Sequence, residues 1–599
     1  VRLPTGQSQT KHTRGTESDR AHGPNERKAN RPEPARRAGR GDQIAMAHSS
    51  GPTAEVDPRS GYCAATRAFR SKRADVPLPA DPDLDVVTFL ATRRHSGVVA
   101  LVDAATGRRT TFAELWRAVS GAATALSLPP FSLRKGHVAL ILSPNSVHFP
   151  IAALAAMSLG AVVTTANPLN TAAEIAKQVA DARPVLVFTT RELLPKLPHA
   201  DLPVVLLEPG AGRLPADDPR VVATIEEISA TPPDLAPRRR DRVTQDDQAT
   251  LLYSSGTTGP SKGVVATHRN LISMVQIVMN RFRLEDSDTT ETFLCTVPMF
   301  HVYGLVAFAT GLLGCGATVV VLSKFELPEM LRCISAYGVT YLPLVPPILV
   351  AMVAYPKPLP LGNLRKVLSG GAPLSKELIE GFREKYPQVE ILQGYGLTES
   401  TAIGASTDSA EESRRYGTAG LLSPNTEAKI VDPESGEALP VNRTGELWIR
   451  GPYVMKGYFK NVEATQSTVT PDGWLKTGDL CYIDEDGYLF VVDRLKELIK
   501  YKGYQVPPAE LEALLLTHPE VADVAVIPYP DREVGQFPMA YVVRKKGSNL
   551  SAHDVMEFVA KQVAPYKKVR KVAFVTDIPK NASGKILRKD LIKLATSKL

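Results

Sequence analysis

The sequence has few cysteines, and their spacing suggests neither a metal site nor a cross-linked framework. Five are scattered over 599 residues without a closely spaced pair; they are Cys63, Cys295, Cys315, Cys333 and Cys481. An odd number argues against a complete set of disulfides. We therefore expect a protein of a reducing, intracellular compartment.

Long hydrophobic runs are also scarce. One segment, 302–322, has no charged residue over 21 positions, which is long enough to span a bilayer. It contains four glycines, however, and it ends in the strand-like run Thr318-Val319-Val320-Val321-Leu322. A buried helix, a glycine turn and a core strand explain this pattern better than a membrane span. The sequence predicts no transmembrane helix.

An excess of positive charge is confined to the first part of the chain. Residues 1–45 contain ten Lys or Arg and five Asp or Glu, so they carry +5 of the formal net charge of +8. The rest is nearly balanced, which does not indicate a nucleic-acid-binding surface. Its length and ordinary content of hydrophobic and charged residues predict a globular protein of at least two domains.

Residues 1–45 have almost no apolar side chains and are expected to be a disordered basic extension. The chain begins with Val, and Met46 opens a more ordinary sequence. One hypothesis is that translation starts at Met46 and that residues 1–45 are not translated. An organelle transit peptide and a nucleic-acid-binding tail are the alternatives, the first weakened by the acidic residues. Residues 46–84 are expected to lead into the first domain.

The sequence does contain a loop that suits a polyphosphate. A short apolar run at 249–253 is followed by Ser254-Ser255-Gly256-Thr257-Thr258-Gly259-Pro260-Ser261-Lys262-Gly263. Glycine lets several backbone N–H groups turn toward one anion, hydroxyl groups donate further hydrogen bonds, and the lysine adds a positive charge. The spacing is not that of the Walker motif. A flexible linker is the alternative, but a lysine beyond a strand favours phosphate binding.

Between about residues 85 and 493, strand-like and helix-like segments alternate. Short apolar runs at Val138–Leu142, 184–188 and 204–207 predict buried strands, and 151–159 predicts a helix. We found no internal repeat. Such alternation predicts an α/β fold of layered helices and largely parallel strands.

The character of the sequence changes near residue 493. The segment 493–503 is dense in charge, 509–516 has a helical pattern and 521–527 alternates like a strand. We therefore expect a large α/β domain over 85–493 and a small, mobile α+β domain over 494–599. The chain ends in Ser597-Lys598-Leu599, the peroxisomal address. This ending predicts binding to the peroxisomal import receptor and a location in the peroxisome.

Five further motifs follow the phosphate loop in order. They are Pro298-Met299-Phe300-His301-Val302-Tyr303-Gly304, Gln393-Gly394-Tyr395-Gly396-Leu397-Thr398-Glu399, Lys476-Thr477-Gly478-Asp479-Leu480, the segment 493–503, and Pro579-Lys580-Asn581-Ala582-Ser583-Gly584-Lys585. With them the chain, from about residue 85 to its end, resembles the acyl-adenylate-forming superfamily and its plant 4-coumarate:CoA ligase-like branch.

The resemblance implies an ATP-dependent acid–thiol ligase that works in two steps. A carboxylate attacks the α-phosphate of Mg-ATP and releases pyrophosphate, and the thiolate of coenzyme A then displaces AMP to form a thioester. A luciferase-like oxygenase shares the adenylation motifs and is the alternative. Cations and oriented donors must neutralise charge in the first step, because it brings an anion onto a polyanion.

For the nucleotide, the resemblance implies a role for each motif. The phosphate-loop residues Ser254, Ser255, Gly256, Thr257, Thr258 and Lys262 would hold the β- and γ-phosphates. Adenine would lie between the segment Gln393-Gly394-Tyr395 and Gly371. Thr398 would contact phosphate, and Glu399 would coordinate Mg²⁺, a cation that prefers oxygen ligands. Asp479 and Arg494 would bind the ribose hydroxyl groups.

Two residues are implied to act on the reacting groups. Lys585 would lie over the substrate carboxylate and the α-phosphate, although a lysine in a basic tail is ordinarily a surface residue. His301 would position the carboxylate and then assist thioester formation, although a lone histidine in an apolar stretch is ordinarily part of a core. The acid itself would be bound by a pocket of Tyr303, Ala307, Leu368, Ala402, Ile403 and Gly404.

The small domain is implied to rotate between the two half-reactions. Lys496 would be the hinge and also contact substrate, and Lys500 would enter the active site as a catalytic, substrate-binding residue in the thioester step. Coenzyme A would be bound by Lys324, Lys502, Gly503 and Gln505. A solvated basic face is the alternative interpretation of these lysines.

The acid is the least determined part of the prediction. Authentic 4-coumarate ligases continue from the adenine motif to a Pro-Val-Leu triplet, whereas this chain has Ala402-Ile403-Gly404. Gly371 likewise replaces a common alanine. A smaller side chain at the pocket predicts a roomier or differently shaped site, which changes selectivity by only about 1–3 kcal/mol. A medium or long fatty acid, a jasmonate-precursor-type acid and a cinnamate-type acid all stay open.

Overall fold

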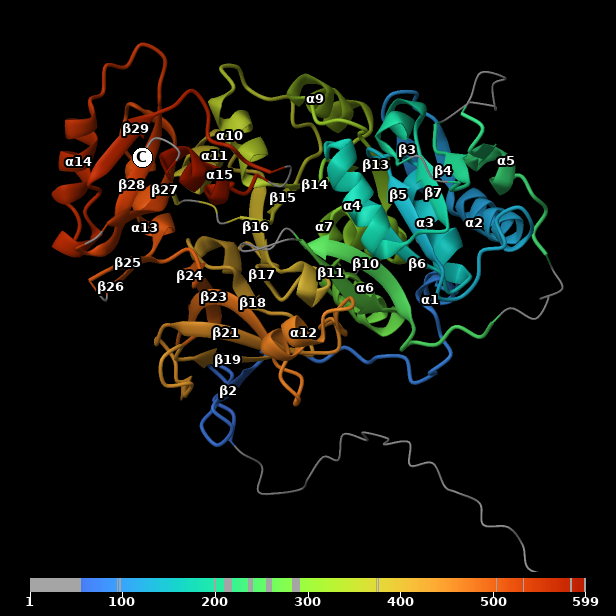
Figure 1. Cartoon of the computed structure of the whole chain (residues 1–599), viewed down its shortest axis with the longest axis horizontal. Helices are drawn as coiled ribbons and strands as arrows, with labels where there is room; N and C mark the ends of the chain where they lie inside the picture. Colours follow the sequence, from blue (N-terminus) through green and yellow to red (C-terminus); the bar gives the residue numbers. More distant parts are fainter. Residues whose placement is uncertain are drawn as a thin grey trace, which may run out of the picture. The chain divides into compact units, whose positions relative to one another are not determined.

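A computed structural model describes residues 55–93, 95, 98–198, 201–208, 218–234, 241–254, 261–282, 291–372, 374, 376–502, 504–531, 533–581 and 584–596. Within this part of the chain, the strands form three sheets flanked by helices (Figure 1). The predicted disordered extension 1–45, part of the phosphate loop and the terminal Ser597-Lys598-Leu599 lie outside the described residues.

The first sheet carries the phosphate loop. Its strand order is β22-β11-β10-β6-β5-β7-β8-β9. The strands from β10 to β9 are parallel, whereas β11 runs antiparallel between β10 and β22. Their bounds are β5 Val138–Leu142, β6 Val162–Ala166, β7 Leu186–Thr189, β8 Val204–Leu206, β9 Val221–Thr224, β10 Gln248–Ser254, β11 Lys262–Thr267 and β22 Gly457–Tyr458.

The second sheet carries most of the other motifs. Its order is β1-β2-β19-β21-β23-β24-β18-β17-β16-β15-β14-β12-β13-β3-β4, with β20 beside β19. The run from β16 to β3 is parallel, and the strands from β17 to β1 pair antiparallel. The bounds are β1 Tyr62–Cys63, β2 Ala68–Arg70, β3 Val99–Asp103, β4 Arg109–Thr111, β12 Thr292–Cys295, β13 Thr318–Val321, β14 Tyr341–Leu344, β15 Lys366–Ser369, β16 Glu390–Tyr395, β17 Ala405–Ser406, β18 Gly420–Leu422, β19 Glu427–Val431, β20 Ala438–Leu439, β21 Gly445–Arg450, β23 Leu475–Ile483 and β24 Tyr488–Arg494.

The third sheet is smaller and lies at the end of the chain. It consists of β25 Ile499–Tyr501, β26 Tyr504–Val506, β27 Val521–Asp531, β28 Gly535–Arg544 and β29 Lys571–Phe574. The second sheet ends at Arg494 and the third begins at Ile499. The predicted division of the chain at 493/494 thus falls next to this change of sheet, and the domain limits stay a prediction.

Amphipathic and buried helices cover these sheets. The α-helices are α1 Val86–Ala91, α2 Phe112–Ser127, α3 His148–Ser158, α4 Ala172–Ala182, α5 Ile225–Ser229, α6 His268–Phe282, α7 Val302–Gly304, α8 Leu312–Gly314, α9 Leu327–Ala336, α10 Pro346–Ala354, α11 Lys376–Lys385, α12 Val462–Thr468, α13 Pro508–Leu516, α14 Ala552–Ala560 and α15 Arg588–Thr596. Shorter helical turns are η1 Arg191–Lys196, η3 Leu305–Gly311, η4 Thr398–Ser400, η5 Glu412–Arg414 and η6 Pro565–Lys567.

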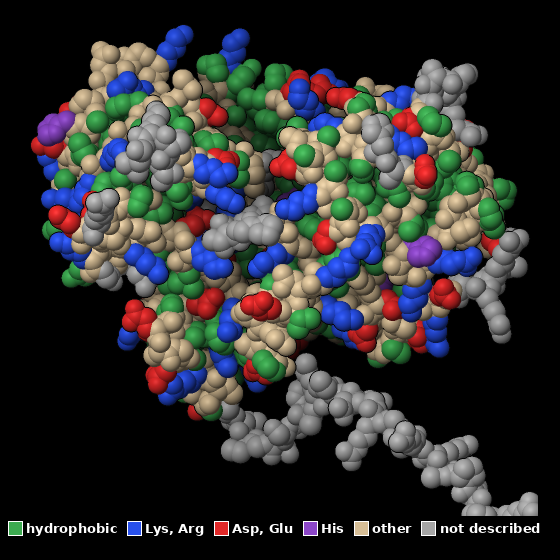
Figure 2. All heavy atoms as spheres, in the orientation of Figure 1, with side chains coloured by type: hydrophobic (Ala, Val, Ile, Leu, Met, Phe, Trp, Pro, Cys, Tyr) green, Lys and Arg blue, Asp and Glu red, His purple; other side chains and the backbone are tan. Residues whose placement is uncertain are grey.

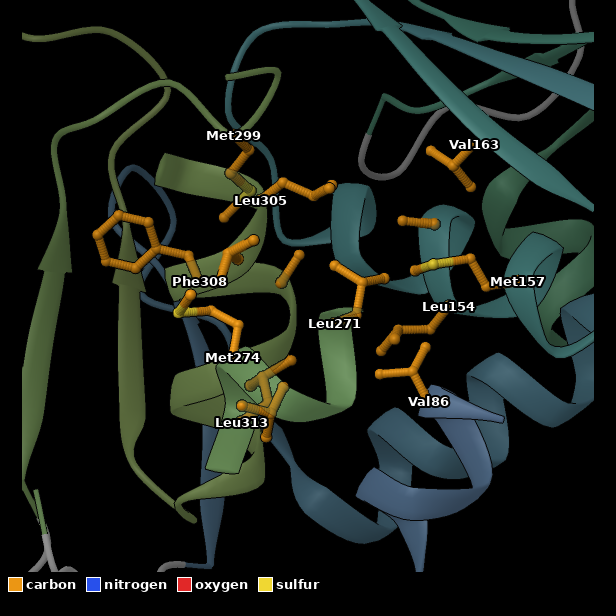
Figure 3. Close-up of a cluster of buried hydrophobic side chains, with 14 of the residues drawn as sticks. Val86, Leu154, Met157, Val163, Leu271, Met274, Met299, Leu305, Phe308 and Leu313 are labelled. Carbon is orange, nitrogen blue, oxygen red and sulfur yellow. The ribbon is translucent and has the colours of Figure 1, made fainter. Parts of the chain in front are cut away.

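The main core joins α3 and α6 to the segment after His301. Side chains from these elements, among them Leu154, Leu271 and Phe308, belong to one cluster of buried hydrophobic residues, in which the Phe308 ring is directed away from the two leucines (Figure 3). They are fully or almost fully buried. This packing fixes the position of the start of the 302–322 segment, and with it the backbone of the adjacent His301.

The predicted elements are confirmed with small shifts at their ends. The four segments 138–142, 184–188, 204–207 and 151–159 correspond to β5, β7, β8 and α3, and the α/β class is as expected. The run 302–322 forms α7, η3, α8, a glycine turn at Gly316 and β13. No helix among the described residues is long and apolar enough to cross a membrane. The sequence did not predict that η3 is a π-helix.

Charges of both signs are interspersed over the face in Figure 2. Ion pairs occur among the described residues, for example Arg415 with Asp484 and Arg269 with Asp246. This distribution agrees with the nearly balanced charge of residues 46–599.

Candidate functional site

The phosphate loop connects the ends of two antiparallel strands. Ser254 closes β10 and lies opposite Lys262, the first residue of β11. The loop residues Ser255, Gly256, Thr257 and Thr258 lie outside the described residues. The pairing nevertheless brings the first hydroxyl and the lysine of the motif to the same end of the sheet, so both can face one ligand.

A tyrosine that the sequence did not predict joins this loop to the metal candidate. The Lys262 ammonium lies 4.9 Å from the centre of the Tyr458 ring, and the Tyr458 hydroxyl donates to Glu399 Oε1 at 2.9 Å. β22 holds Tyr458 beside β11, with Tyr458 opposite Val264. Lys262 and Glu399, which are far apart in the sequence, therefore lie at one site.

The turn that carries Thr398 and Glu399 is tightly packed. A side chain at Gly396 would collide with the carbonyl oxygen of Ala402, since a Cβ there would lie 1.3 Å from it. The backbone N–H of Met455 donates to the carbonyl of Glu399 at 2.9 Å. Only glycine fits this approach, and it allows η4 to present Thr398 and Glu399 next to the phosphate loop.

Asp479, Arg494 and Tyr395 form a connected polar group at the site. Asp479 on β23 lies opposite Arg494 on β24. Its Oδ1 is 2.9 Å from Arg494 Nε, and its Oδ2 accepts a hydrogen bond of 2.6 Å from the Tyr395 hydroxyl. Burial raises the pKa of Asp479, whereas Arg494 and the Tyr395 hydroxyl lower it. Burial has the larger effect, so the pKa of Asp479 stays above its usual value and the two partners offset only part of the desolvation of the carboxylate.

Lys585 lies within electrostatic range of this group. Burial lowers the pKa of Lys585, Arg494 lowers it further, and Glu497 and Asp479 act in the opposite direction. Its backbone N–H donates to Asn581 Oδ1 at 2.8 Å. The preceding Gly584 has φ +78°, and a Cβ there would lie 2.7 Å from Pro347 on α10. The glycine therefore allows the backbone at Gly584 to pack closely against Pro347, while Lys585 lies within electrostatic range of Asp479 and Arg494.

His301 lies at the start of α7. Its Nδ1 accepts a hydrogen bond of 3.3 Å from the backbone N–H of Tyr303. Burial lowers the pKa of His301, so the imidazole is neutral at neutral pH. A neutral ring with one nitrogen already bonded can donate from the other nitrogen, which suits positioning a carboxylate better than carrying a permanent charge.

An apolar pocket adjoins this segment. Five of the predicted acid-binding residues line it, namely Tyr303, Ala307, Leu368, Ala402 and Ile403. Further walls come from α6 and β12, including Phe282 and Phe293. Gly404 does not line the pocket, because a Cβ there would face Ile449 and Tyr395 at 3.7 and 3.8 Å. The extra room predicted from Gly404 therefore does not lie in this pocket, and the extra room predicted from Gly371 stays a prediction.

The residues predicted to flank adenine lie within or just after two neighbouring parallel strands. β16 contains Gln393, Gly394 and Tyr395, and the adjacent β15 is followed by Gly371, which has φ +85°. Ser369 pairs with Gln393, so Gly371 and Tyr395 lie at the same edge of the sheet. The carboxyl edge of parallel strands is where α/β proteins commonly bind nucleotides.

The lysines expected in the thioester step are not part of the polar group formed by Asp479, Arg494 and Tyr395. Lys496, Lys500 and Lys502 are exposed, and Lys324, whose side chain is 82% exposed, pairs with Glu326 at 3.1 Å. Gly503 and the side chain of Gln505 lie outside the described residues. The structure thus brings Lys585, and not Lys500, to Asp479 and Arg494.

Comparison with known proteins places this geometry in a family. The model of the AMP-binding enzyme family matches residues 89–459, and that of the AMP-binding enzyme C-terminal domain matches residues 510–585. The chain belongs to the AMP-binding enzymes. Within them it is a member of the plant 4-coumarate–CoA ligase-like branch, and it is an ATP-dependent carboxylate–CoA ligase that forms an acyl-AMP intermediate.

Two curated relatives and one solved structure illustrate the match. The chain is 90% identical to "4-coumarate--CoA ligase-like 4" of Oryza sativa subsp. japonica over 92% of this chain and 99% of the relative. It is 62% identical to "Peroxisomal OPC-8:0-CoA ligase 1" of Arabidopsis thaliana over 91% and 99%. Its structure is similar to o-succinylbenzoate CoA synthetase from Bacillus subtilis in complex with the acyl-adenylate OSB-AMP, with a TM-score of 0.71, 28% identity and coverage of 85% and 98%.

Sequence reasoning missed two residues of the site. Tyr458 lies in the short Gly457–Tyr458 strand, where nothing in the sequence distinguishes it from a core tyrosine. Arg281 lies at the end of α6 and lines the acid pocket. A charged residue in a helix rich in apolar residues was the available signal, but a helix C-terminus ordinarily explains an arginine.

Proposed function

We propose that the acid activated by this ligase is a medium- or long-chain aliphatic acid of the jasmonate-precursor type, such as OPC-8:0. The observation that carries this proposal is the lining of the pocket. Aliphatic side chains from α6 and η3, such as Val278 and Val306, form its inner walls with Phe282 and Phe293. An aliphatic chain gains free energy in proportion to the apolar surface that such walls remove from water.

The name of the Arabidopsis relative supports the same acid class. That protein is named for OPC-8:0, and it shares 62% of its aligned residues with this chain. Ala402 stands where authentic 4-coumarate ligases carry proline, and it lines the pocket. An alanine methyl group in place of the proline ring leaves the pocket wall near Tyr303 more open. This favours a substrate that is bulkier or more flexible than a cinnamate.

For adenylation, we assign the nucleotide to the carboxyl edge of β15 and β16. The loop from Ser254 to Lys262 binds the β- and γ-phosphates, Gln393, Gly394, Tyr395 and Gly371 flank adenine, and Asp479 and Arg494 bind the ribose. Glu399, with Thr398 beside it, is the carboxylate for Mg²⁺, which commonly uses one or two carboxylates together with substrate phosphates. The bound ion would neutralise phosphate charge.

Lys585 and His301 act on the acid. Lys585 lies within electrostatic range of both Arg494 and Asp479, so its ammonium can neutralise charge that develops between the carboxylate and the α-phosphate. The neutral His301 ring orients the carboxylate, and the acyl chain runs past Tyr303 and Leu368 into the pocket.

We assign the second half-reaction to a rotated small domain with its hinge at Lys496. Rotation would exchange Lys585 for the exposed face of β25, which carries Lys500, and would bring Lys502, Gly503 and Gln505 toward coenzyme A, with Lys324 across from them. Support comes from the exposure of these lysines and from the change of sheet between Arg494 and Ile499. Rotation of a domain about a few linker residues is a common way to alternate two active arrangements.

The same proposal places the enzyme in the peroxisome, imported through Ser597, Lys598 and Leu599. The relative from Arabidopsis is itself named peroxisomal. A fluorescent fusion that keeps the free terminus should be imported, and removal of Leu599 should leave it in the cytosol. Import that survives this deletion contradicts the assignment.

A panel of acids tests the acid class. Medium-chain fatty acids, OPC-8:0, cinnamate and 4-coumarate are each supplied with ATP, Mg²⁺ and coenzyme A, and AMP and thioester are measured. We expect kcat/KM for the aliphatic acids to exceed that for 4-coumarate by roughly tenfold or more, as a difference of 1–3 kcal/mol in a pocket allows. A preference for 4-coumarate would overturn the proposal.

A further inference from the structure

Arg281 is a buried cation in the wall of the apolar pocket. Its side chain is 5% exposed, and it lines the pocket together with Phe282 and Tyr303. Among the residues that line the pocket and that the structure describes, Arg281 is the one with a charge. A charged group is costly to bury unless it is paired and hydrogen-bonded, so each of its nitrogens needs a partner.

The structure supplies only part of these partners. Arg281 Nη2 donates to the carbonyl oxygen of Thr407 at 2.8 Å, and Nε lies 3.2 Å from Asp408 Oδ1. Neither Nε nor Nη1 makes a well-directed hydrogen bond with any residue that the structure describes, and both atoms are fully buried. A purely structural role of Arg281 at the C-terminal end of α6 therefore explains the hydrogen bond of Nη2 and the ion pair with Asp408. It leaves Nη1 without a hydrogen-bond partner among the described residues.

The charge of Arg281 is already balanced. Asp408 is shared with Arg73, whose Nη1 lies 3.1 Å from Asp408 Oδ2, and Arg73 Nη2 also pairs with Glu412 at 2.7 Å. Two arginines and two carboxylates thus form a neutral cluster. A second carboxylate in the pocket would add an uncompensated negative charge, whereas an uncharged oxygen would add a hydrogen bond without changing the balance.

The position of Arg281 also indicates where that oxygen lies. Thr407, the acceptor for Nη2, donates its own N–H to the carbonyl of Gln393 at 2.9 Å. Gln393 lies two residues before Tyr395, the end of β16 that faces the nucleotide site. At a rise of about 3.3 Å per residue, the guanidinium is anchored about 7 Å inward from that edge. It therefore meets the acyl chain away from the reacting carboxylate.

We propose that Arg281 is a specificity-determining residue that donates through Nη1 to an uncharged oxygen, a carbonyl or hydroxyl group, on the inner part of the acyl chain. This inference rests on the proposed function, since it refines the acid that the pocket accepts. Ligase substrates are then oxygenated acids rather than plain fatty acids or dicarboxylic acids. A hydrogen bond from a charged donor changes affinity by roughly ten- to hundredfold when its partner is removed.

Paired acids test the proposal on the full-length enzyme. One pair is a medium-chain acid with and without a carbonyl group in the half of the chain remote from the carboxylate, the part that would lie innermost in the pocket. The other pair is 4-coumarate and cinnamate, and the dicarboxylic acid of the same chain length is added. The ratio of kcat/KM for the oxygenated and the plain acid is the readout. The wild type should favour the oxygenated aliphatic acid roughly ten- to hundredfold and use the dicarboxylic acid poorly.

Two variants separate recognition from support of the fold. Arg281→Met keeps the apolar stem, and its ratio should fall to about one while the plain acid is still used. Arg73→Met disturbs the same Asp408 cluster from outside the pocket lining and should keep the wild-type ratio. Arg281→Lys, which keeps the charge for Asp408 but not the planar fork, should also lose most of the preference.

Each result has a defined meaning. If the wild type converts one of the acid pairs but uses its oxygenated and plain members equally well, the role of Arg281 is overturned, whether or not any variant folds. An equal change of this ratio in Arg73→Met and Arg281→Met overturns it as well. If only the cinnamate pair is converted, the proposed aliphatic class fails, and the ratio of 4-coumarate to cinnamate decides the role of Arg281 independently.

Discussion

The proposed nucleotide end and the proposed acyl end of the site are built in different ways. At the nucleotide end, Asp479 and Arg494 come from the neighbouring strands β23 and β24 and Tyr395 comes from β16, and Asp479 bonds directly to both of the others. At the acyl end, apolar side chains from a helix, a π-helix and several strands each cover a small part of the wall. The binding free energy of a polar site comes from a few hydrogen bonds and ion pairs, whereas that of an apolar site is spread over many weak contacts. Single changes should therefore disable the first region and only redirect the second.

The largest effect is expected for Lys585→Ala. Loss of the ammonium near Asp479 and Arg494 should lower adenylation by about 10²–10³-fold, because one charge-stabilising donor is removed. ATP–pyrophosphate exchange measures this step. Lys589→Ala, an exposed lysine on α15, is the matched control and should be nearly wild type. Normal exchange in Lys585→Ala would contradict the role given to this residue.

Asp479→Asn should have the next largest effect. The change removes the charge that pairs with Arg494 and that would accept from the ribose, so KM for ATP should rise roughly ten- to hundredfold. Asp484→Asn is the control, because Asp484 is also buried and pairs with Arg415 away from the site. Both variants should lose thermal stability, but only the first should change KM for ATP. Equal KM values in the two variants would show that Asp479 does not bind the nucleotide.

Ala307→Leu should redirect the enzyme rather than disable it. The added side chain fills part of the pocket, which should shift preference from longer to shorter acids by about 1–3 kcal/mol. KM for ATP should stay unchanged, which separates this region from the nucleotide end. Ala113→Leu, on the exposed part of α2, is the control. If chain-length preference is the same in all three proteins, Ala307 does not face the acid.

The smallest effect concerns pH. Burial and Arg494 lower the pKa of Lys585 from its ordinary value of 10.5. The cationic form is the active one, and it is lost as the pH rises through this lowered pKa. Exchange activity should therefore decline on the alkaline side below pH 10.5 in the wild type. Lys585→Arg, whose guanidinium stays charged, should keep its residual activity there, and an unchanged alkaline limb would exclude Lys585 as its cause.

Local sequence patterns predicted much of the nucleotide end. The strand β5 matches its predicted limits, and the polar residues after two hydrophobic runs lie beyond strand ends, the phosphate loop after β10 and Glu399 after β16, whereas Asp479 lies inside β23. What these patterns do not contain is the pairing of strands. The contact of Tyr458 with Lys262 and Glu399 depends on β22 lying beside β11, which is a long-range arrangement.

The acyl end was predicted less completely for the same reason. Tyr303, Ala307, Leu368, Ala402 and Ile403 do line one pocket, but Gly404 faces Ile449 and Tyr395 instead. Arg281 was not singled out. A pocket wall has no motif, because its residues share only their position in space.

The sequence by itself determined the class of fold, the family and the two-step chemistry, because glycines, hydroxyls and charged residues at close spacing have few other uses. The tertiary structure alone decided which residues meet. It joined Asp479 to Tyr395 and Lys262 to Tyr458, and it buried Arg281 with a nitrogen that lacks a partner among the described residues. Hydrogen bonds and burial between distant segments arise only when the sheets pair and the helices pack, so they are absent from any local pattern.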